Sequence, residues 1–476
     1  EYERTSTATV NAYLQPLMSR YLTRLSSRAG ALRVMQSSGG SVSARVASRE
    51  PVRTILSGPA GGVVGALSAA RASGFPDIVT FDMGGTSTDV ALCAGGELRT
   101  TNESVVAGLP VAVPVLDIHT VGAGGGSIAR VDAGGSLRVG PESAGAAPGP
   151  ACYGRGTQPT VTDANLVLGR FGGAQLLGGD FHLDSRRALD ALNDLAREMT
   201  TAGGRRVSAI EAALGVVRVV NAGMERALRV VSVERGFDTR AFTLVSFGGA
   251  GGLHAVALAL ALKIPRVVVP QRPGALSALG ALQADVVRDA SRTVMLDAAG
   301  DLSTLERAFR EMERTARASL GREGFDDARQ RHARSVAARY RGQSFELEIR
   351  FNKPSGIAAA FHRAHLARYG YAQSANAVEV VSARVRSRGL VEKIKTGRPA
   401  ARTTSRAPLR PRDFAQVHFD ARPVRTAVYA REELPAGARL RSPCVVTEYS
   451  STTLVPSGAR ARVDELGNLI VELTRE

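Results

Sequence analysis

Apolar residues recur along this chain with two different periods, and this pattern predicts a mixed α/β protein. Side chains at helical spacing predict helices at 5–28, 207–234 and 302–323. Short apolar runs, several of them bounded by glycine, predict buried strands at 78–83, 242–247 and 266–269. A stretch rich in Arg, Pro and Thr at 396–412 is typical of a linker or long loop. The tail from 415 to 473 is expected to form short strands with glycine turns.

Two further helices, at 57–71 and 273–284, are predicted to be lined with glycine and alanine. Each glycine inside a helix costs about 1 kcal/mol relative to alanine. A face of small residues compensates for that cost where another helix must approach closely. We therefore expect close helix packing at these two segments.

One segment carries the clearest candidate chemistry, the sequence Phe-Asp-Met-Gly-Gly-Thr-Ser-Thr-Asp at 81–89. Gly84 and Gly85 let bare backbone N–H groups approach an anion. The next three side chains, those of residues 86–88, are hydroxyls that donate to phosphate oxygens, and Asp82 and Asp89 suit Mg²⁺ held through its waters. The alternative is a β-hairpin with a glycine turn and a polar tip. We favour phosphate binding.

Two more glycine-rich loops follow strands or turns, at 122–127 and 248–252. The later loop leads from a predicted strand into a helix, which is favourable geometry for an anion or a nucleoside. The earlier loop superficially suggests a dinucleotide fingerprint, but Ser127 stands where a third glycine is needed, and no acidic residue is expected in a following strand about 20 residues on. A Rossmann site is therefore not predicted.

Composition narrows the classes of protein. The chain has 476 residues, which favours two or three domains, and no apolar run is long enough for a membrane span. Its three cysteines are far apart and form neither a disulfide framework nor a zinc motif, so we expect a cytoplasmic protein. The net charge of +17 raises the possibility of nucleic-acid binding. The basic residues are scattered and aromatic content is only 5%, so neither a nucleic-acid nor a membrane partner is expected.

Taken in order, six motifs resemble one family: Ser-Gly-Pro-Ala-Gly-Gly-Val-Val-Gly at 57–65, the 81–89 motif, Val-Gly-Ala-Gly-Gly-Gly-Ser-Ile at 121–128, Ala-Pro-Gly-Pro-Ala-Cys-Tyr-Gly at 147–154, Val-Thr-Asp-Ala-Asn-Leu-Val-Leu-Gly-Arg at 161–170 and Ser-Phe-Gly-Gly-Ala-Gly at 246–251. The series is similar to the hydantoinase A / 5-oxoprolinase / acetone carboxylase β-subunit family, of the ATP-dependent N-methylhydantoinase A type. The resemblance runs through nearly the whole chain.

The resemblance implies the sugar-kinase/Hsp70/actin-like (ribonuclease H-like) fold, with ATP in the cleft between two lobes. It implies that Asp82 and Asp89 are catalytic and hold Mg²⁺ or Mn²⁺. It also implies that three glycine loops bind the nucleotide, through Gly84, Gly85, Thr86, Ser87, Thr88, Gly124, Gly125, Gly248, Gly249, Ala250 and Gly251. This sequence has Gly252 where the family often has proline, which we expect to loosen the turn into the helix.

The resemblance also implies a reaction and a division of the chain. We expect an ATP-dependent hydrolase subunit that activates a cyclic amide, of the hydantoin or 5-oxoproline type, by phosphoryl transfer before ring opening. The expected domains are 1–50 as a linking helix and strand, 51–290 as the ATP-binding lobe and 291–476 as a C-terminal α+β domain with a β-rich tail. The expected partner is a hydantoinase B-type subunit in a hetero-oligomer.

Two alternatives stay open at this point. The same family includes the ATP-binding β subunit of a ketone carboxylase of the acetone type, and the motifs do not separate the two reactions. The resemblance also implies a first phosphate loop that this sequence lacks, so we expect the N-terminal lobe to be missing and to be supplied in trans. On that interpretation the chain alone is inactive, as half of a split enzyme or as a non-catalytic partial lobe with a structural role.

Several single residues have both a structural and a functional interpretation. Asp163 is equally consistent with a role as a helix N-cap and with a contact in the active site. His254 and Cys152 are expected to be structural rather than catalytic. His362 and His365 have helical spacing, but no third metal ligand lies near them in the sequence, so we do not predict a metal site there.

Overall fold

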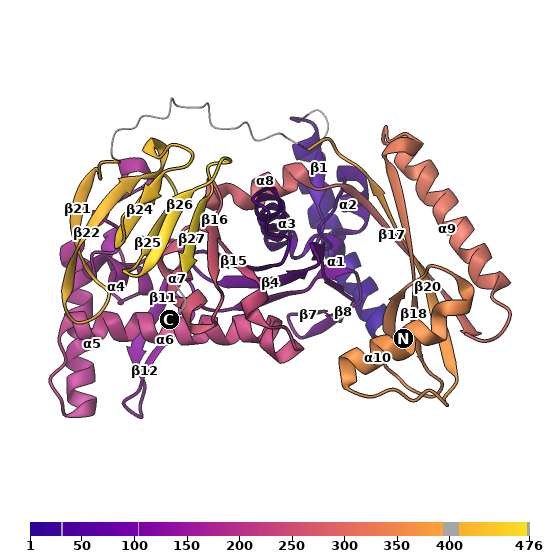
Figure 1. Ribbon diagram of the computed structural model, residues 1–476, viewed down its shortest axis with the longest axis horizontal. Coiled ribbons are helices and arrows are strands. Elements are labelled where there is room, and N and C mark those ends of the chain that lie inside the picture. Colours follow the sequence, from indigo (N-terminus) through magenta and orange to yellow (C-terminus); the bar gives the residue numbers. More distant parts are fainter. Residues whose placement is uncertain (30–31, 103, 394–408, 474–476) are drawn as a thin grey trace.

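The computed structural model describes residues 1–29, 32–102, 104–393 and 409–473. The molecule is long, and its two large sheets lie side by side along the long axis with helices around them (Figure 1). The helices are α1 (Tyr2–Ser26), α2 (Ala44–Arg49), α3 (Ser57–Ala72), α4 (Val161–Val167), α5 (Ser185–Gly203), α6 (Ala209–Val231), α7 (Gly251–Ala261), α8 (Leu276–Gln283), α9 (Ser303–Arg322) and α10 (Ile357–Tyr369). No described helix is long and apolar enough to span a bilayer.

The larger sheet has nine strands and holds the candidate site. Its hydrogen-bonded order is β10 (Ile118–Val121), β4 (Thr88–Ala94), β3 (Ile78–Met83), β15 (Thr243–Phe247), β16 (Arg266–Val269), β27 (Leu469–Leu473), β26 (Ala459–Val463) and β23 (Arg439–Leu440), with β5 (Glu97–Leu98) paired to β4. The first three strands are antiparallel, whereas β15 runs parallel to β3 and β16 runs parallel to β15.

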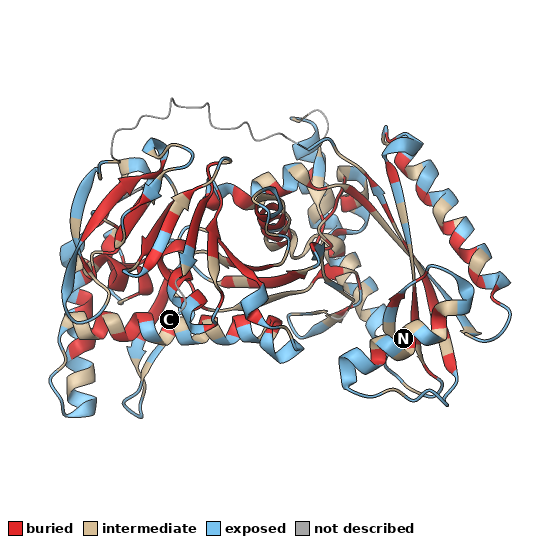
Figure 2. Ribbon diagram, in the orientation of Figure 1, coloured by how far each residue is buried: buried red, intermediate tan, exposed pale blue. Residues whose placement is uncertain are grey.

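Both faces of this sheet are covered, which explains the nearly continuous apolar runs of its central strands. Successive side chains of a strand point to opposite faces. Val79 and Phe81 of β3 pack with residues of α4, α6 and α7. Ile78 packs on the other face, with residues of α3. The centre of the sheet is accordingly buried on both sides (Figure 2).

The tail of the chain extends this sheet. β27 pairs antiparallel with β16, with Val471 opposite Val267. Beside it lies a four-stranded sheet of β21 (Asp413–His418), β22 (Pro423–Ala430), β24 (Cys444–Glu448) and β25 (Ser451–Val455). Residues far apart in the sequence are thereby placed beside the glycine loops.

The second large sheet has the order β1 (Arg33–Met35), β2 (Ser41–Ser43), β17 (Val286–Asp297), β20 (Val378–Gly389), β18 (Gln330–Tyr340) and β19 (Leu347–Arg350). Helices α9 and α10 cover it. The expected domain boundary between residues 290 and 291 falls inside β17, because that strand is continuous. The linker expected at 396–412 lies mostly outside the described residues.

Four short antiparallel pairs of strands form within the connecting segments of the described residues. They are β6 (Thr100–Thr101) with β9 (Val115–Leu116), β7 (Ser104–Val106) with β8 (Leu109–Val111), β11 (Ser127–Val131) with β12 (Leu137–Ser143) and β13 (Gln175–Leu176) with β14 (Phe181–His182).

Helices α3 and α8 pack as closely as their small residues predict. A Cβ added at Gly280 would lie 1.9 Å from the carbonyl oxygen of Gly61. A Cβ at Gly61 would lie 2.6 Å from the carbonyl oxygen of Ser277, and one at Gly65 would lie 2.6 Å from that of Leu276. The prediction of close helix packing is therefore confirmed.

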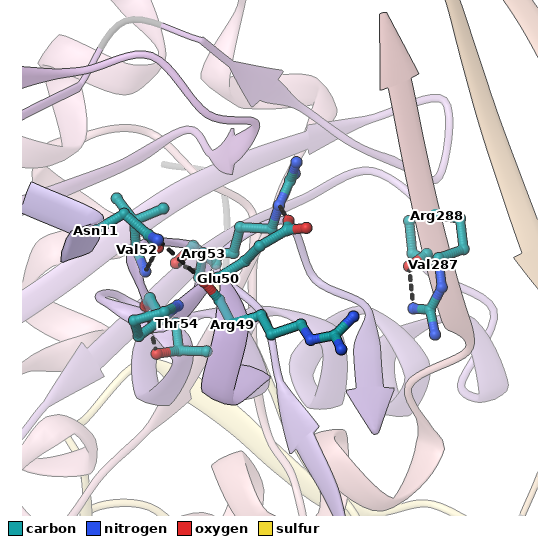
Figure 3. A network of polar contacts seen from close by, with 10 residues as sticks. Asn11, Arg49, Glu50, Val52, Arg53, Thr54, Val287 and Arg288 are labelled. Atoms are coloured by element: carbon teal, nitrogen blue, oxygen red, sulfur yellow. Dashed lines mark hydrogen bonds and ion pairs between the residues drawn. The ribbon is translucent and has the colours of Figure 1, made fainter. Parts of the chain in front are cut away.

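Side chains of α1 hold the segment that follows it, and the hydrogen bonds of one of them, Asn11, are drawn in Figure 3. The Nδ2 atom of Asn11 donates to the carbonyl oxygen of Arg49 at 3.0 Å, and its Oδ1 atom accepts from the backbone N–H of Val52 at 3.3 Å. The end of α2 and the short 3₁₀ helix Pro51–Thr54 are thus held against α1.

Candidate functional site

Two of the three glycine loops meet because their strands are parallel neighbours. In the register of β3 and β15, Phe247 lies opposite Asp82. The carboxyl ends of both strands therefore reach the same edge of the sheet, where ligands bind in open α/β sheets. The backbone N–H of Ala250 donates to the carbonyl oxygen of Met83 at 3.1 Å, which fixes the second loop against the first.

The third glycine loop lies on top of the first. The N–H of Gly125 donates to the carbonyl oxygen of Gly84 at 3.0 Å, and that of Gly126 donates to Gly85 at 2.6 Å. A Cβ at Gly124 would lie 2.7 Å from the carbonyl carbon of Gly85. Glycine at 124 is thus required by packing, and the three loops form one continuous backbone surface.

The glycines of this surface serve two purposes. Gly248 has φ +78°, and a Cβ there would lie 2.5 Å from Oδ1 of Asp82, so the fold itself excludes a side chain. At Gly85 no protein atom lies within 4 Å of an added Cβ, and the residue is exposed. Because packing does not demand glycine at that position, close approach of a ligand is the remaining physical reason for it.

Asp82 and Asp89 face each other across the antiparallel pair of β3 and β4. Residues directly opposite in such a pair place their side chains on the same face. Burial raises the pKa of Asp82 to about 7, with a smaller contribution from the charge of Asp89. Burial also raises the pKa of Asp89, although Thr120 Oγ1 opposes this by donating to its Oδ1 at 2.5 Å.

This pair of carboxylates fits a divalent cation. Both acids are half-buried, and no positively charged group of the described residues is among the causes of their raised pKa values, so a divalent cation would stabilise both in the ionised form. Mg²⁺ typically binds one or two carboxylates and keeps several waters, so two ligands are sufficient.

The three hydroxyl residues of the first loop have different surroundings. Thr86 is exposed and Ser87 is half-buried, both at the tip between the strands. Thr88 is buried, and its Oγ1 donates to the carbonyl oxygen of Ala123 at 2.5 Å. Thr88 therefore supports the loop at 122–127, whereas the other two side chains lie where a ligand would pass.

A cavity of about 330 Å³ opens beside these loops. Its lining includes Gly84, Gly85, Gly125, Gly249 and Ala250. Four aromatic side chains also line it, namely Tyr153, Phe171, Phe181 and Tyr449. Tyr153 belongs to the motif at 147–154, whereas Phe171 follows α4, Phe181 lies in β14 and Tyr449 lies in the turn between β24 and β25. The sequence did not single out these rings as a group, because they come from separate segments of the chain.

The second loop is packed more tightly than expected. Gly252 lies inside α7 rather than in the turn, and it is buried. A Cβ there would lie 2.5 Å from the carbonyl oxygen of Thr452 in β25. The expectation of a looser turn is wrong, because the helix contacts the four-stranded sheet at this glycine.

Asp163 has a structural role that the sequence left open. Its buried carboxylate accepts from the backbone N–H groups of Ala151 at 3.1 Å, Cys152 at 2.8 Å and Thr160 at 2.9 Å, and from Thr160 Oγ1 at 2.7 Å. With Thr160 it forms a capping box at the start of α4. Burial raises the pKa of the Cys152 thiol, so the expectation of an unreactive cysteine agrees with its surroundings.

His254 is also structural. It is fully buried, and burial lowers its pKa to about 3, with a smaller contribution from the charge of Arg170. Its Nδ1 atom lies 2.7 Å from Oδ1 of Asn221, and its Nε2 atom lies 3.3 Å from Nδ2 of Asn165. The ring is therefore neutral at physiological pH and holds α6, α7 and α4 together.

The histidines of α10 bind other protein groups. His362 Nδ1 lies 2.8 Å from the hydroxyl of Tyr340, and His365 Nδ1 lies 2.8 Å from the carbonyl oxygen of Tyr371. Across the described ranges, no cluster of three or more His, Cys, Asp or Glu side chains is arranged for a metal ion. The magnesium assignment accordingly rests on the two facing carboxylates alone.

Comparison with known proteins places this site in a family. Residues 4–290 match the family model described as Hydantoinase/oxoprolinase, and residues 292–473 match that of the Hydantoinase/oxoprolinase C-terminal domain. The caprolactamase subunit alpha of Pseudomonas jessenii is 35% identical, over 98% of this chain and 69% of that protein.

Two solved structures share the architecture. The crystal structure of the ATP-dependent caprolactamase from Pseudomonas jessenii matches with a TM-score of 0.89 and 34% identity, over 100% of this chain and 71% of that chain. A nucleotide-free structure of acetone carboxylase matches with a TM-score of 0.79 and 25% identity, over 100% of this chain and 70% of that chain. The prediction of the actin-like fold is confirmed. The chain belongs to the hydantoinase/oxoprolinase family.

Proposed function

We propose that this chain binds ATP at the three glycine loops and activates a cyclic amide by phosphoryl transfer before the ring opens. The observation that carries the proposal is the pair Asp82 and Asp89, facing each other directly beneath the loops. The likeness to an ATP-dependent caprolactamase supports the cyclic amide as substrate class. We assign Thr86, Ser87 and the backbone N–H groups of the first and third loops to the phosphates.

The aromatic cavity would hold the base of the nucleotide. It adjoins Gly249 and Ala250 of the second loop, so a nucleotide with its phosphates at Gly84 and Gly85 reaches it directly. Aromatic side chains bind nucleobases by stacking, worth about 1–3 kcal/mol per base. Tyr449 is the most suitable of the four rings to test, because 63% of its surface is exposed.

The chemistry needs no covalent intermediate with the protein. The carbonyl oxygen of the cyclic amide forms a bond to the γ-phosphorus of ATP while the bond from that phosphorus to the β,γ-bridging oxygen breaks, and ADP leaves. Water then adds to the activated carbon, and the carbon–nitrogen bond of the ring breaks, with the nitrogen leaving as a protonated amine, to give an acyl phosphate. A second water hydrolyses the acyl phosphate, which releases inorganic phosphate and leaves the open amino acid. A poor electrophile thereby gains a good leaving group, at the expense of one ATP.

The protein contributes position and charge to such a transfer. Asp82 and Asp89 would hold Mg²⁺ or Mn²⁺, which when bound neutralises charge on the phosphates. The hydroxyls of Thr86 and Ser87 would orient the terminal phosphate.

We further propose a hydantoinase B-type subunit as partner, since the caprolactamase relative is named as a subunit alpha. The chain covers 71% of the solved caprolactamase chain, so the complete reaction is best tested with a first lobe added as a separate chain. The three free cysteines and the use of ATP favour the cytoplasm as the place of action.

A ketone carboxylase is the second candidate, because the acetone carboxylase structure matches over the whole chain. A non-catalytic, structural role is the third. In the test, the chain is combined with a B-type partner and a first lobe, and ATP is added together with 5-oxoproline, N-methylhydantoin, caprolactam, or acetone plus bicarbonate. The release of ADP is then measured for each substrate.

We expect ADP release that requires a cyclic amide, lost in Asp89→Asn and retained in Asp132→Asn, whose side chain lies far from the loops in the exposed turn between β11 and β12. ADP release only with acetone and bicarbonate would replace the hydrolase by the carboxylase. No turnover with any substrate, from a folded and assembled complex, would favour the structural role.

A further inference from the structure

A second and larger cavity, of about 720 Å³, lies away from the glycine loops. It is lined by residues of α5, α6 and α7, of the loop between β21 and β22, and of the tail. Of the described residues, only Leu253 lines both this cavity and the aromatic one. The two cavities are therefore neighbours on either side of α7, and the proposed nucleotide does not occupy this one.

The walls of the cavity are mainly apolar. They include Val217 of α6, Val256 and Leu260 of α7, and Leu454 and Pro456 of the tail. Leu260 is 52% exposed, which is unusual for a leucine on a helix that otherwise faces the core. A volume between about 300 and 1,000 Å³ with apolar walls and few polar groups is typical of small-molecule sites.

One buried charged group in this cavity has no carboxylate partner among the described residues. Arg170 lines the cavity and is 6% exposed. Its Nε atom donates to the carbonyl oxygen of His418 at 3.1 Å, and the described residues provide no carboxylate within ion-pair distance. Burial lowers the pKa of its guanidinium to about 10, although the residue stays charged at physiological pH. Buried charges are normally paired, so the remaining nitrogens of the guanidinium are suited to an anion that enters the cavity.

The other charged residues around the cavity leave its buried end positively charged. Arg205 is paired with Glu211 at 3.0 Å, so these two residues neutralise each other. Arg218 also lines the cavity, and it is exposed. Asp420, an exposed residue of the loop, accepts from the backbone N–H of Arg422 at 2.9 Å. The buried end of the cavity is therefore positive, whereas the single unpaired carboxylate is at the exposed rim.

We propose that this cavity is a second ligand site, for an organic carboxylate with an apolar body, whose carboxylate pairs with Arg170. A planar guanidinium matches a carboxylate through two parallel hydrogen bonds. The apolar walls favour a hydrocarbon body over a sugar or a polyphosphate. The site is independent of the proposed reaction, because it needs neither ATP nor the glycine loops.

The test is calorimetric titration of the full chain with octanoate, with octylammonium and inorganic phosphate as comparison ligands. We expect octanoate to bind with one site per chain, and neither comparison ligand to bind. Arg170→Gln should weaken octanoate binding at least tenfold. Ala257→Trp should abolish it, since Ala257 is an exposed wall residue of α7 and a large ring there fills the cavity without disturbing the core.

The control is a matched pair of arginines on α6. Arg218→Gln removes a charge that lines the cavity, and Arg226→Gln removes an exposed charge that does not. We expect the first to weaken binding several-fold and the second to leave it unchanged. Absence of octanoate binding, equal binding of octylammonium, or wild-type affinity in Ala257→Trp would each overturn the proposal. Ala257→Trp also keeps the test decisive if Arg170→Gln does not fold.

Discussion

Replacing Asp82 by asparagine should make the protein more stable while removing its proposed metal site. The folded protein holds this carboxyl at a pKa of about 7, against 3.8 in an unfolded chain. An acid with a raised pKa costs no stability below pH 3.8, and the cost grows with pH until it is complete above pH 7. One pKa unit corresponds to about 1.4 kcal/mol, so the cost is about 4 kcal/mol at pH 8 and about 2 kcal/mol at pH 5.

Asparagine carries no charge and should relieve this cost. We expect Asp82→Asn to raise the free energy of unfolding by up to about 4 kcal/mol at pH 8, and by about half as much at pH 5. The assay is urea unfolding followed by circular dichroism, without divalent cations. Asp132→Asn is the control, and it should lower the free energy of unfolding rather than raise it. The reason is that the Arg138 guanidinium holds the pKa of this carboxyl below its usual range. If Asp82→Asn has wild-type stability at pH 8, burial beside Asp89 does not raise the pKa of Asp82 as the structure indicates.

Three further substitutions test separate parts of the structure. Gly280→Ala should lower the free energy of unfolding by about 1–3 kcal/mol or more, because its Cβ meets backbone. Gly223→Ala on α6 has open space and should raise it by about 0.5–1 kcal/mol. Unchanged or higher stability in Gly280→Ala, measured by urea unfolding, would contradict the packing of α3 on α8. Asp163→Ala should lower the free energy of unfolding by at least about 3 kcal/mol in urea, because three buried backbone N–H groups lose their acceptor. An unchanged free energy of unfolding would show that water replaces the carboxylate. Tyr449→Ala should weaken ATP binding about tenfold in calorimetry and Tyr449→Phe should not, and equal affinities in all three proteins would remove the base from the aromatic cavity.

The sequence predicted those features that depend on neighbouring residues. The strand, the glycine turn and the second strand at 78–94 follow from the local sequence pattern. The small residues of α3 and α8 likewise indicate that these two helices pack closely. The pairing of Asp82 with Asp89 also follows, because a short turn between two antiparallel strands places them opposite each other.

Other features depend on parts of the chain that the sequence cannot bring together by pattern alone. Tyr449 reaches the glycine loops only because the four-stranded sheet of the tail packs against α7 and carries this residue in the turn between β24 and β25. Thr88 was grouped with Thr86 and Ser87, but the pleat of β4 turns its hydroxyl toward Ala123. The role of Asp163 became clear only when the loop at 151–160 was seen to fold back over its carboxylate.

The central claim is that the glycine loops and the facing carboxylates form a site for ATP and a divalent cation. Calorimetric titration of the chain with ATP and Mg²⁺, beside Asp82→Asn, tests it most directly. The account predicts binding by the folded wild-type chain that requires Mg²⁺ and is lost in the variant. Equal heats for the two proteins, or binding that is indifferent to Mg²⁺, would contradict it.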